Sequence, residues 1–279
     1  MDPVFVTHTP PPQLRPFVAS AVGYHVPAAP AGVHRGLPSR HLTLVIDLDQ
    51  PLEATAPTGS TSARAMLGGL STSPVLLAAA TPQRGMQYAL TVLGVHALLG
   101  VPSRAVAGLN LDLVDVLGPD AARLLDRLHE VSPPGGATPW AGFDIVDDLL
   151  TARLTAVQGP PPEVTEAWRA IFRPSNPLTR VDALANHIGW SRRHLTERFG
   201  DSTGLTPQSA IRLARFERAH DLLLAPARAP LAALALAAGY ADQAHLSRDW
   251  REFSGDNIST WLREELPFVQ DRPADAGTD

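Results

Sequence analysis

A chain of 279 residues is long enough for two domains, because single domains usually run about 100 to 200 residues. Hydrophobic residues make up 44% and charged residues 18%, which excludes a wholly disordered or fibrous protein. The absence of cysteine excludes disulfides, thiolate metal sites and a cysteine nucleophile. The net charge is -5, but residues 163–263 hold 13 arginines against 11 acidic residues, a local excess of +2 between two acidic flanks.

The amino-terminal end has no basic start followed by an apolar run, and no later stretch reaches 18 consecutive apolar residues. Neither a secretory signal nor a membrane-spanning helix is predicted. We therefore expect a cytoplasmic protein with no membrane partner.

Three short apolar runs in the first half are typical of strands in a small β-rich domain. They are residues 42–48, 74–79 and 88–99. Two amphipathic stretches follow, residues 119–130 and 140–157, and their apolar spacing predicts helices that form a dimer seam or pack on their own domain. We expect these elements to form one domain over residues 1–157.

A proline-rich run at residues 158–162 cannot continue a helix and favours an extended spacer, so the domain boundary is expected there. Beyond it nearly every segment has helical spacing. Thr206 followed by Pro207 predicts a capped helix start, Pro230 predicts another, and Gly189 and Gly239 suit tight turns between helices. An all-helical domain is expected over residues 163–265, followed by a disordered tail at 266–279.

This second half contains an internal repeat with a spacing of 50 to 51 residues. The equivalent pairs are Ala185 and Ala235, Gly189 and Gly239, Trp190 and Tyr240, Leu195 and Leu246, Phe199 and Trp250, and Gly204 and Gly255. Each copy predicts a short helix, a glycine turn and a second helix with one apolar face. This is the pattern of a helix-turn-helix, whose second helix can enter a DNA major groove.

The polar faces of the two second helices carry side chains of the types that can read or contact DNA. Arginine can bind guanine with two hydrogen bonds, glutamine can pair with adenine, and glutamate can accept from cytosine. The candidate DNA-binding residues are Arg192, Arg193, Thr196 and Glu197 in the first copy and Gln243, Ala244, Ser247, Arg248 and Arg251 in the second. Arg212, in the helix between the copies, is a candidate for phosphate contact or for a salt bridge to Glu217 or Asp221.

Residues 180–263 resemble the DNA-binding domain of the AraC/XylS family of transcription regulators. The matching motifs are Gly189-Trp190-Ser191, Leu195-Thr196-Glu197-Arg198-Phe199, Gly204-Leu205-Thr206-Pro207 and Ala235-Leu236-Ala237-Ala238-Gly239-Tyr240. The resemblance implies two recognition helices, joined by a long central helix, that enter successive major grooves. Glu197 departs from the arginine common there, so it either prefers cytosine or holds Arg193 through an i, i+4 pair.

The resemblance also implies an α+β architecture. Its first domain, residues 1–157, would be a small, cupin-like β-barrel with helices that senses an effector or makes a dimer. Its second would be an all-α domain of two helix-turn-helix motifs. The expected partner is double-stranded DNA, with a small-molecule effector and a homodimer as further candidates. No cofactor and no catalysis are expected.

Three other interpretations have weaker support. Four histidines, His25, His34, His41 and His96, invite a metal site, but their spacing lacks the close His-x-His pair of cupin-type sites. Residues 69–73 resemble a nucleophile elbow but end in Ser73 rather than glycine. The alternative function is therefore an enzyme of small-molecule metabolism with a helical appendage.

Overall fold

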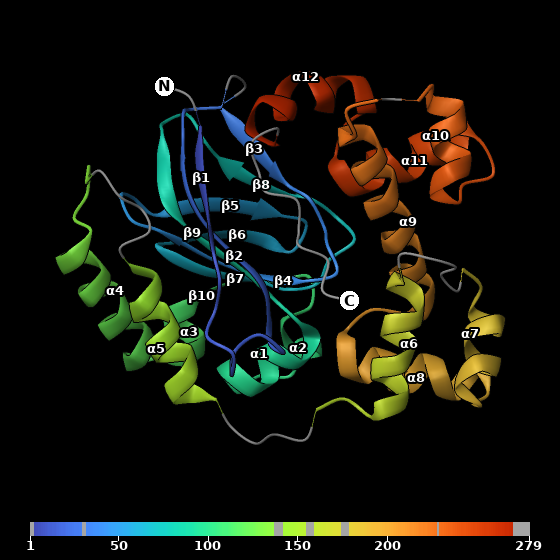
Figure 1. Ribbon diagram of the computed structural model, residues 1–279, viewed down its shortest axis with the longest axis horizontal. Coiled ribbons are helices and arrows are strands. Elements are labelled where there is room, and N and C mark those ends of the chain that lie inside the picture. Colours follow the sequence, from blue (N-terminus) through green and yellow to red (C-terminus); the bar gives the residue numbers. More distant parts are fainter. Residues whose placement is uncertain are drawn as a thin grey trace.

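The computed structural model describes residues 3–29, 32–136, 142–154, 159–173, 179–227 and 229–269, of which 266–269 are described by their backbone. A sheet-containing amino-terminal part lies beside an all-helical carboxy-terminal part (Figure 1). The predicted α+β division into a sheet half and a helical half is confirmed.

Two antiparallel sheets form the amino-terminal part. The larger has the strand order β1 (Val4–His8), β2 (Val18–Val26), β9 (Gln83–Leu90), β4 (Leu42–Asp47), β7 (Ala65–Gly68) and β10 (Asn110–Asp112). The smaller has the order β3 (Val33–Gly36), β8 (Val75–Ala78), β5 (Leu52–Ala56) and β6 (Gly59–Ala63).

Alternation along the strands gives the larger sheet two buried faces. Leu42, Leu44 and Ile46 of β4 join the main core, whereas Val45 packs against a smaller cluster that includes Leu52 of β5. The described strands leave β1 and β10 at the edges of one sheet and β3 and β6 at the edges of the other. The described strands therefore form the predicted sheet domain as two sheets, and their pairing does not close into one barrel.

One strand prediction extended too far. The strand β9 ends at Leu90, and residues 92–99 form helix α1 (Val92–Leu99) instead of continuing the strand. Thr91 caps this helix, since its side chain accepts from the backbone N–H of Gly94 at 3.0 Å. A short apolar run does not distinguish a buried strand from a buried helix, so the cap decided the outcome.

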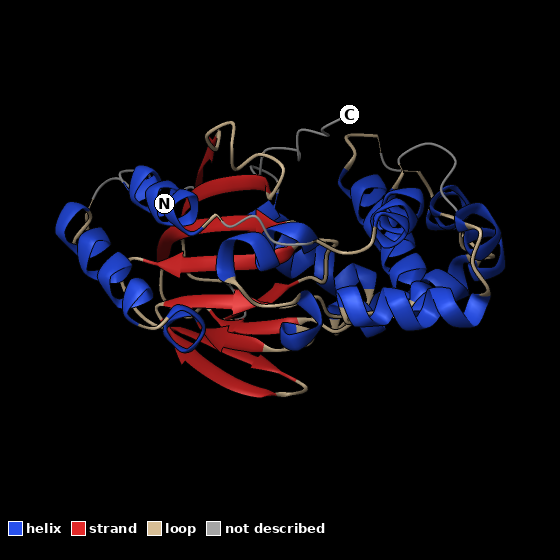
Figure 2. Cartoon of the chain, turned by 90° about the horizontal axis from the view of Figure 1, so that it is seen from below, coloured by secondary structure: helices blue, strands red, loops and turns tan. Residues whose placement is uncertain are grey.

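The other helices of this part flank the sheets in Figures 1 and 2. They are α2 (Ser103–Val106), α3 (Leu113–Leu117), α4 (Pro119–Val131) and α5 (Phe143–Arg153). The two predicted amphipathic helices are confirmed as α4 and α5, although residues 140–141 and 155–157 lie outside the described residues. Leu124 and Leu128 of α4 and Leu150 of α5 join the main core, so both helices pack on their own domain.

In the carboxy-terminal part every regular element of the described residues is a helix, as predicted. They are α6 (Pro162–Phe172), α7 (Val181–Ile188), α8 (Arg192–Thr203), α9 (Pro207–Leu224), α10 (Leu231–Ala238), α11 (Gln243–Ser254) and α12 (Ile258–Val269). Pro162, expected in the spacer, begins α6, while Gln158 lies outside the described residues.

Helix α12 continues to Val269, so the first four residues of the predicted tail are helical. The rest of that tail, residues 270–279, lies outside the described residues. In the part of the chain that the structure describes, no helix has the length and apolarity needed to cross a membrane.

Candidate nucleic-acid interface

The internal repeat of the sequence is a repeat in three dimensions. In the first copy Gly189 ends α7 with a positive φ of 78°, and the backbone N–H of Trp190 donates to the carbonyl of Ala185 at 3.0 Å. In the second copy Gly239 ends α10 with a φ of 92°, and Tyr240 donates to Ala235 at 2.9 Å. Only glycine adopts this left-handed conformation without strain, so both turns require it.

Each turn leads into a capped 12-residue helix. The Ser191 hydroxyl accepts from the backbone N–H of His194 at 3.2 Å and caps α8. The Asp242 carboxylate accepts from His245 at 2.7 Å and caps α11. Because these caps fix the start of both helices, the residues of each first turn are held at equivalent positions in the two motifs.

The inward faces of α8 and α11 form the core that the sequence predicts. Leu195 and Phe199 on α8 and Leu246 and Trp250 on α11 are fully buried. Phe216 on α9 packs against Trp250, with ring centroids 5.0 Å apart. Helix α9 therefore supports the second recognition helix directly.

The outward faces carry the predicted DNA-binding side chains. Eight of the nine on α8 and α11 are exposed, and Ser247 is half-buried: Arg192, Arg193, Thr196, Glu197, Gln243, Ala244, Ser247, Arg248 and Arg251. The four on α8 line one shallow, open depression. Their exposure leaves them available to a partner, and their part in DNA reading stays a prediction.

Two contacts restrain the first of these faces. The Thr196 hydroxyl donates to the carbonyl of Arg192 at 2.9 Å, and the Arg192 guanidinium lies 3.5 Å from Asp182 on α7. Between the described side chains of Glu197 and Arg193 there is no ion pair, so the i, i+4 alternative does not form here. Glu197 therefore presents its carboxylate outward.

Arg212 has partners inside the domain. Its Nη2 donates to Asp249 at 2.9 Å and to Glu252 at 2.5 Å, and its guanidinium lies over the ring of Phe253. The Arg212 guanidinium lowers the pKa of the Glu252 carboxyl below its ordinary value through this hydrogen bond. Of the two roles that the sequence leaves open, these contacts favour a salt bridge, with partners on α11 instead of Glu217 or Asp221.

The next arginines on α9 also face the second motif. Arg215 lies over the ring of Tyr240 at 5.2 Å, and Arg218 donates to the carbonyl of Ala238 at 3.4 Å. Burial, followed by the neighbouring charge of Arg215, lowers the pKa of Arg218. Arg215 and Arg218 thus pack along the end of α10 and the turn that precedes α11.

The other candidate sites have different surroundings. His34 lies 2.7 Å from Glu265, and among the described residues no group of three or more His, Cys, Asp or Glu could hold a metal ion. Ser71 of the supposed nucleophile elbow donates to the carbonyl of Ser73. Sequence reasoning missed Asp249 and Glu252 as partners of Arg212, because nothing in their local pattern separates them from solvent-facing acids.

The family comparison decides what these motifs are. Residues 184–264 match the family model described as a helix-turn-helix domain. This region is an AraC-type helix-turn-helix domain. The match covers both α8 and α11, and the chain is a DNA-binding transcriptional regulator.

One solved structure shares the overall fold. ToxT from Vibrio cholerae aligns with a TM-score of 0.51 at 11% identity, over 88% of this chain and 97% of that one. A probable AraC family regulator from Rhodopseudomonas palustris aligns with a TM-score of 0.30 at 25% identity, over 40% of this chain and 94% of that one. None of the curated proteins compared matches the sequence. The ToxT likeness shows that a sheet domain and a helical domain arranged in this way occur together in a known fold.

Proposed function

We propose that this regulator reads two successive major grooves on one side of the DNA, one with α8 and one with α11. The observation that carries the proposal is the repeated motif itself, with equivalent turns and caps on a shared central helix. Because the two motifs have the same local geometry, each presents an equivalent polar helix face, as the binding of two successive major grooves requires. This arrangement suits DNA better than it suits one small substrate.

The proposed base contacts follow from the chemistry of each exposed side chain. Arg193 and Arg248 would bind guanine, Gln243 adenine, and Glu197 the amino group of cytosine. Thr196 and Ser247 would donate or accept at base edges, and Ala244 would contact a thymine methyl group. Arg192 and Arg251 flank these faces, where contact with phosphates would orient each helix.

Arg212 was also a candidate for phosphate contact. Its ion pairs to Asp249 and Glu252 support a different proposal, in which it orients α11 on α9. The salt dependence of DNA binding by an Arg212 variant separates these two roles.

Selection from a library of random duplexes tests the proposed function. The wild-type protein is expected to enrich one sequence family, and mobility-shift titrations should show an affinity that falls steeply with added salt, because neutralised phosphates release counterions. Enrichment of no sequence, or binding that is insensitive to salt, would contradict the proposal.

For the amino-terminal domain we propose a cupin-like sheet domain that senses a small-molecule effector, without catalysis. Its contacts with the helical domain support this role, because a ligand-dependent change in the sheets would alter these contacts. A homodimer and a cytoplasmic location, where the DNA partner lies, complete the proposal. Light scattering tests the oligomeric state, and a thermal-shift screen of small molecules followed by DNA titration tests the effector.

A further inference from the structure

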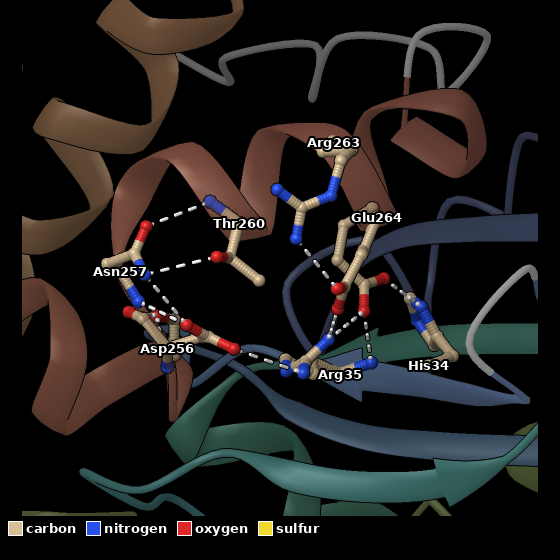
Figure 3. Close-up of polar contacts among 9 residues, drawn as sticks. His34, Arg35, Asp256, Asn257, Thr260, Arg263 and Glu264 are labelled. Atoms are coloured by element: carbon tan, nitrogen blue, oxygen red, sulfur yellow. Dashed lines mark hydrogen bonds and ion pairs between the residues drawn. The ribbon is translucent and has the colours of Figure 1, made fainter.

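The last helix of the DNA-binding domain lies over a strand of the amino-terminal domain. Helix α12 and the turn before it meet β3, as Figures 1 and 3 show. Three acidic residues on this side, Asp256, Glu264 and Glu265, face His34 and Arg35 on the strand. We call these five residues the β3–α12 clamp.

Arg35 is the centre of the clamp. Its backbone N–H donates to Glu265 at 2.9 Å, its Nη1 to Glu264 at 2.8 Å, and its Nη2 to Asp256 at 3.5 Å. One side chain on β3 therefore holds both α12 and the turn that precedes it (Figure 3).

The centre of the clamp is largely shielded from water. The side chain of Glu265 is 1% exposed and that of Arg35 is 15% exposed. His34 contributes a second contact to Glu265 at 2.7 Å. Removing Arg35 would leave a buried carboxylate with only part of its compensation, so loss of this one side chain would disturb the contact between the two domains.

Asp256 connects the clamp to the second recognition helix. Helix α11 ends at Ser254, and Gly255 and Asp256 form the turn that follows it. The Ser254 hydroxyl donates to the carbonyl of Asp256 at 2.9 Å, and Asn257 continues the turn into α12. A force on Asp256 therefore acts at the end of α11, one helical turn beyond Arg251.

A second connection passes through the core. Trp261 on α12 packs edge-on against Trp250 on α11, with ring centroids 5.3 Å apart, and both side chains are fully buried. Movement of α12 would shift Trp250, which lies on the face of α11 opposite the exposed Arg248. Packed side chains of this kind transmit small displacements because protein cores are dense.

We propose that Arg35 is a positioning residue for the second recognition helix: the amino-terminal domain holds the end of α11 through the β3–α12 clamp. This inference rests on the proposed function. It means that a change in the small sheet reaches the second DNA contact without passing through the first motif. Arg35 touches no DNA; it acts through Asp256, Glu264 and Glu265.

The first motif meets the amino-terminal domain in a different way. Gly204, at the end of α8, lies against α2, where a side-chain Cβ would come within 2.3 Å of Ala107. The nearby ion pair of Arg104 and Asp201 is 3.5 Å long and more than half exposed on both sides. Arg104→Ala is therefore a matched control: it removes an interdomain arginine at the first motif, where exposed pairs contribute little.

The test uses the full chain and a duplex selected with the wild-type protein. Footprinting of the wild-type protein locates the two major grooves that it protects on this duplex, and the groove whose protection is lost in Arg248→Ala is the one that α11 contacts. Two altered duplexes each carry a scrambled sequence in one of these grooves. Arg35→Ala is expected to bind the selected duplex at least about fivefold more weakly, at the lower end of usual coupling effects. On the duplex scrambled in the α11 groove, Arg35→Ala and wild type should bind with equal affinity. Arg35→Ala therefore loses only its preference for the selected sequence in the α11 groove and keeps its preference in the α8 groove.

Arg104→Ala should keep wild-type discrimination at both grooves. If Arg35→Ala does not fold, Asp256→Asn replaces it; asparagine keeps an acceptor for Asn257 but loses the charge that faces Arg35, and the same selective loss is expected. A folded variant that discriminates at both grooves like wild type, or that weakens both equally, would overturn the inference alone. A wild-type protein that selects no sequence would instead remove the proposed function.

Discussion

Arg40 donates two hydrogen bonds to Glu217 across the junction of the two domains. Its backbone N–H lies 2.6 Å from Oε1 and its Nε lies 2.8 Å from Oε2. Arg40 precedes β4 in the sheet domain, whereas Glu217 lies midway along the central helix α9. The guanidinium also stacks over the ring of Phe172, so the pair joins the sheet domain to both α9 and α6.

Arg40→Ala should destabilise the folded protein by about 2 to 4 kcal/mol. The Glu217 side chain is only 13% exposed, so removing the Arg40 side chain leaves a poorly compensated charge. Because Arg40 itself is 33% exposed, the loss of unfolding free energy should lie at or below the range usual for breaking a buried ion pair. Denaturant unfolding followed by circular dichroism measures this loss. Arg104→Ala, which removes an exposed interdomain pair, should cost no more than about 1 kcal/mol. Equal losses in the two variants would contradict this account of the junction.

Glu217 should also make stability depend on pH. Burial raises its pKa above the ordinary value of 4.5, against the opposing effect of Arg40, so the folded state holds the proton more tightly than the unfolded chain does. The stability contributed by this proton is fully present below the unfolded pKa and is lost as the pH rises through the folded pKa.

The free energy of unfolding of wild type minus that of Glu217→Gln should therefore increase as the pH falls from neutral toward about 4.5. Denaturant titrations of both proteins over this range give the difference. A difference that decreases on acidification would show that pairing with Arg40 outweighs burial.

The role of Arg212 can be separated from phosphate contact by salt dependence. Arg212→Ala should lower the free energy of unfolding by about 1 to 3 kcal/mol, because Asp249 is nearly buried and loses its partner. The slope of log affinity against log salt should stay at the wild-type value. A slope that is shallower by about one would instead show that Arg212 neutralises a phosphate.

Arg248→Ala tests a single base contact. The side chain is exposed on α11, so folding should be unaffected, while affinity for the selected duplex should fall by about 1 to 3 kcal/mol at one base position. Arg123→Ala, an exposed arginine on α4, serves as the control and should bind like wild type. Unchanged affinity in Arg248→Ala would remove this residue from the proposed contacts.

The sequence predicts the helical half well because its signals are local. Gly189 and Gly239 mark the turns, Ser191 and Asp242 cap the helices that follow, and Leu195 and Leu246 mark the buried faces. Each of these features depends on residues within one or two helical turns, where spacing determines geometry.

Contacts between distant segments could not be predicted in this way. Arg35 and Glu265 are 230 residues apart, and His34 was considered only as a possible metal ligand. Arg212 finds its partners 37 and 40 residues further along the chain. The prediction of a strand over residues 88–99 was partly wrong for a related reason. An apolar run is compatible with both strand and helix, and the helix cap at Thr91 is evident only in the structure.

Methylation interference on the selected duplex tests the central claim most directly, because guanine N7 lies in the major groove. The account predicts two groups of interfering guanines on one face of the DNA, about 10 base pairs apart, with Arg193→Ala removing one group and Arg248→Ala the other. A single group, or two groups on opposite faces, would contradict the reading of successive grooves by α8 and α11.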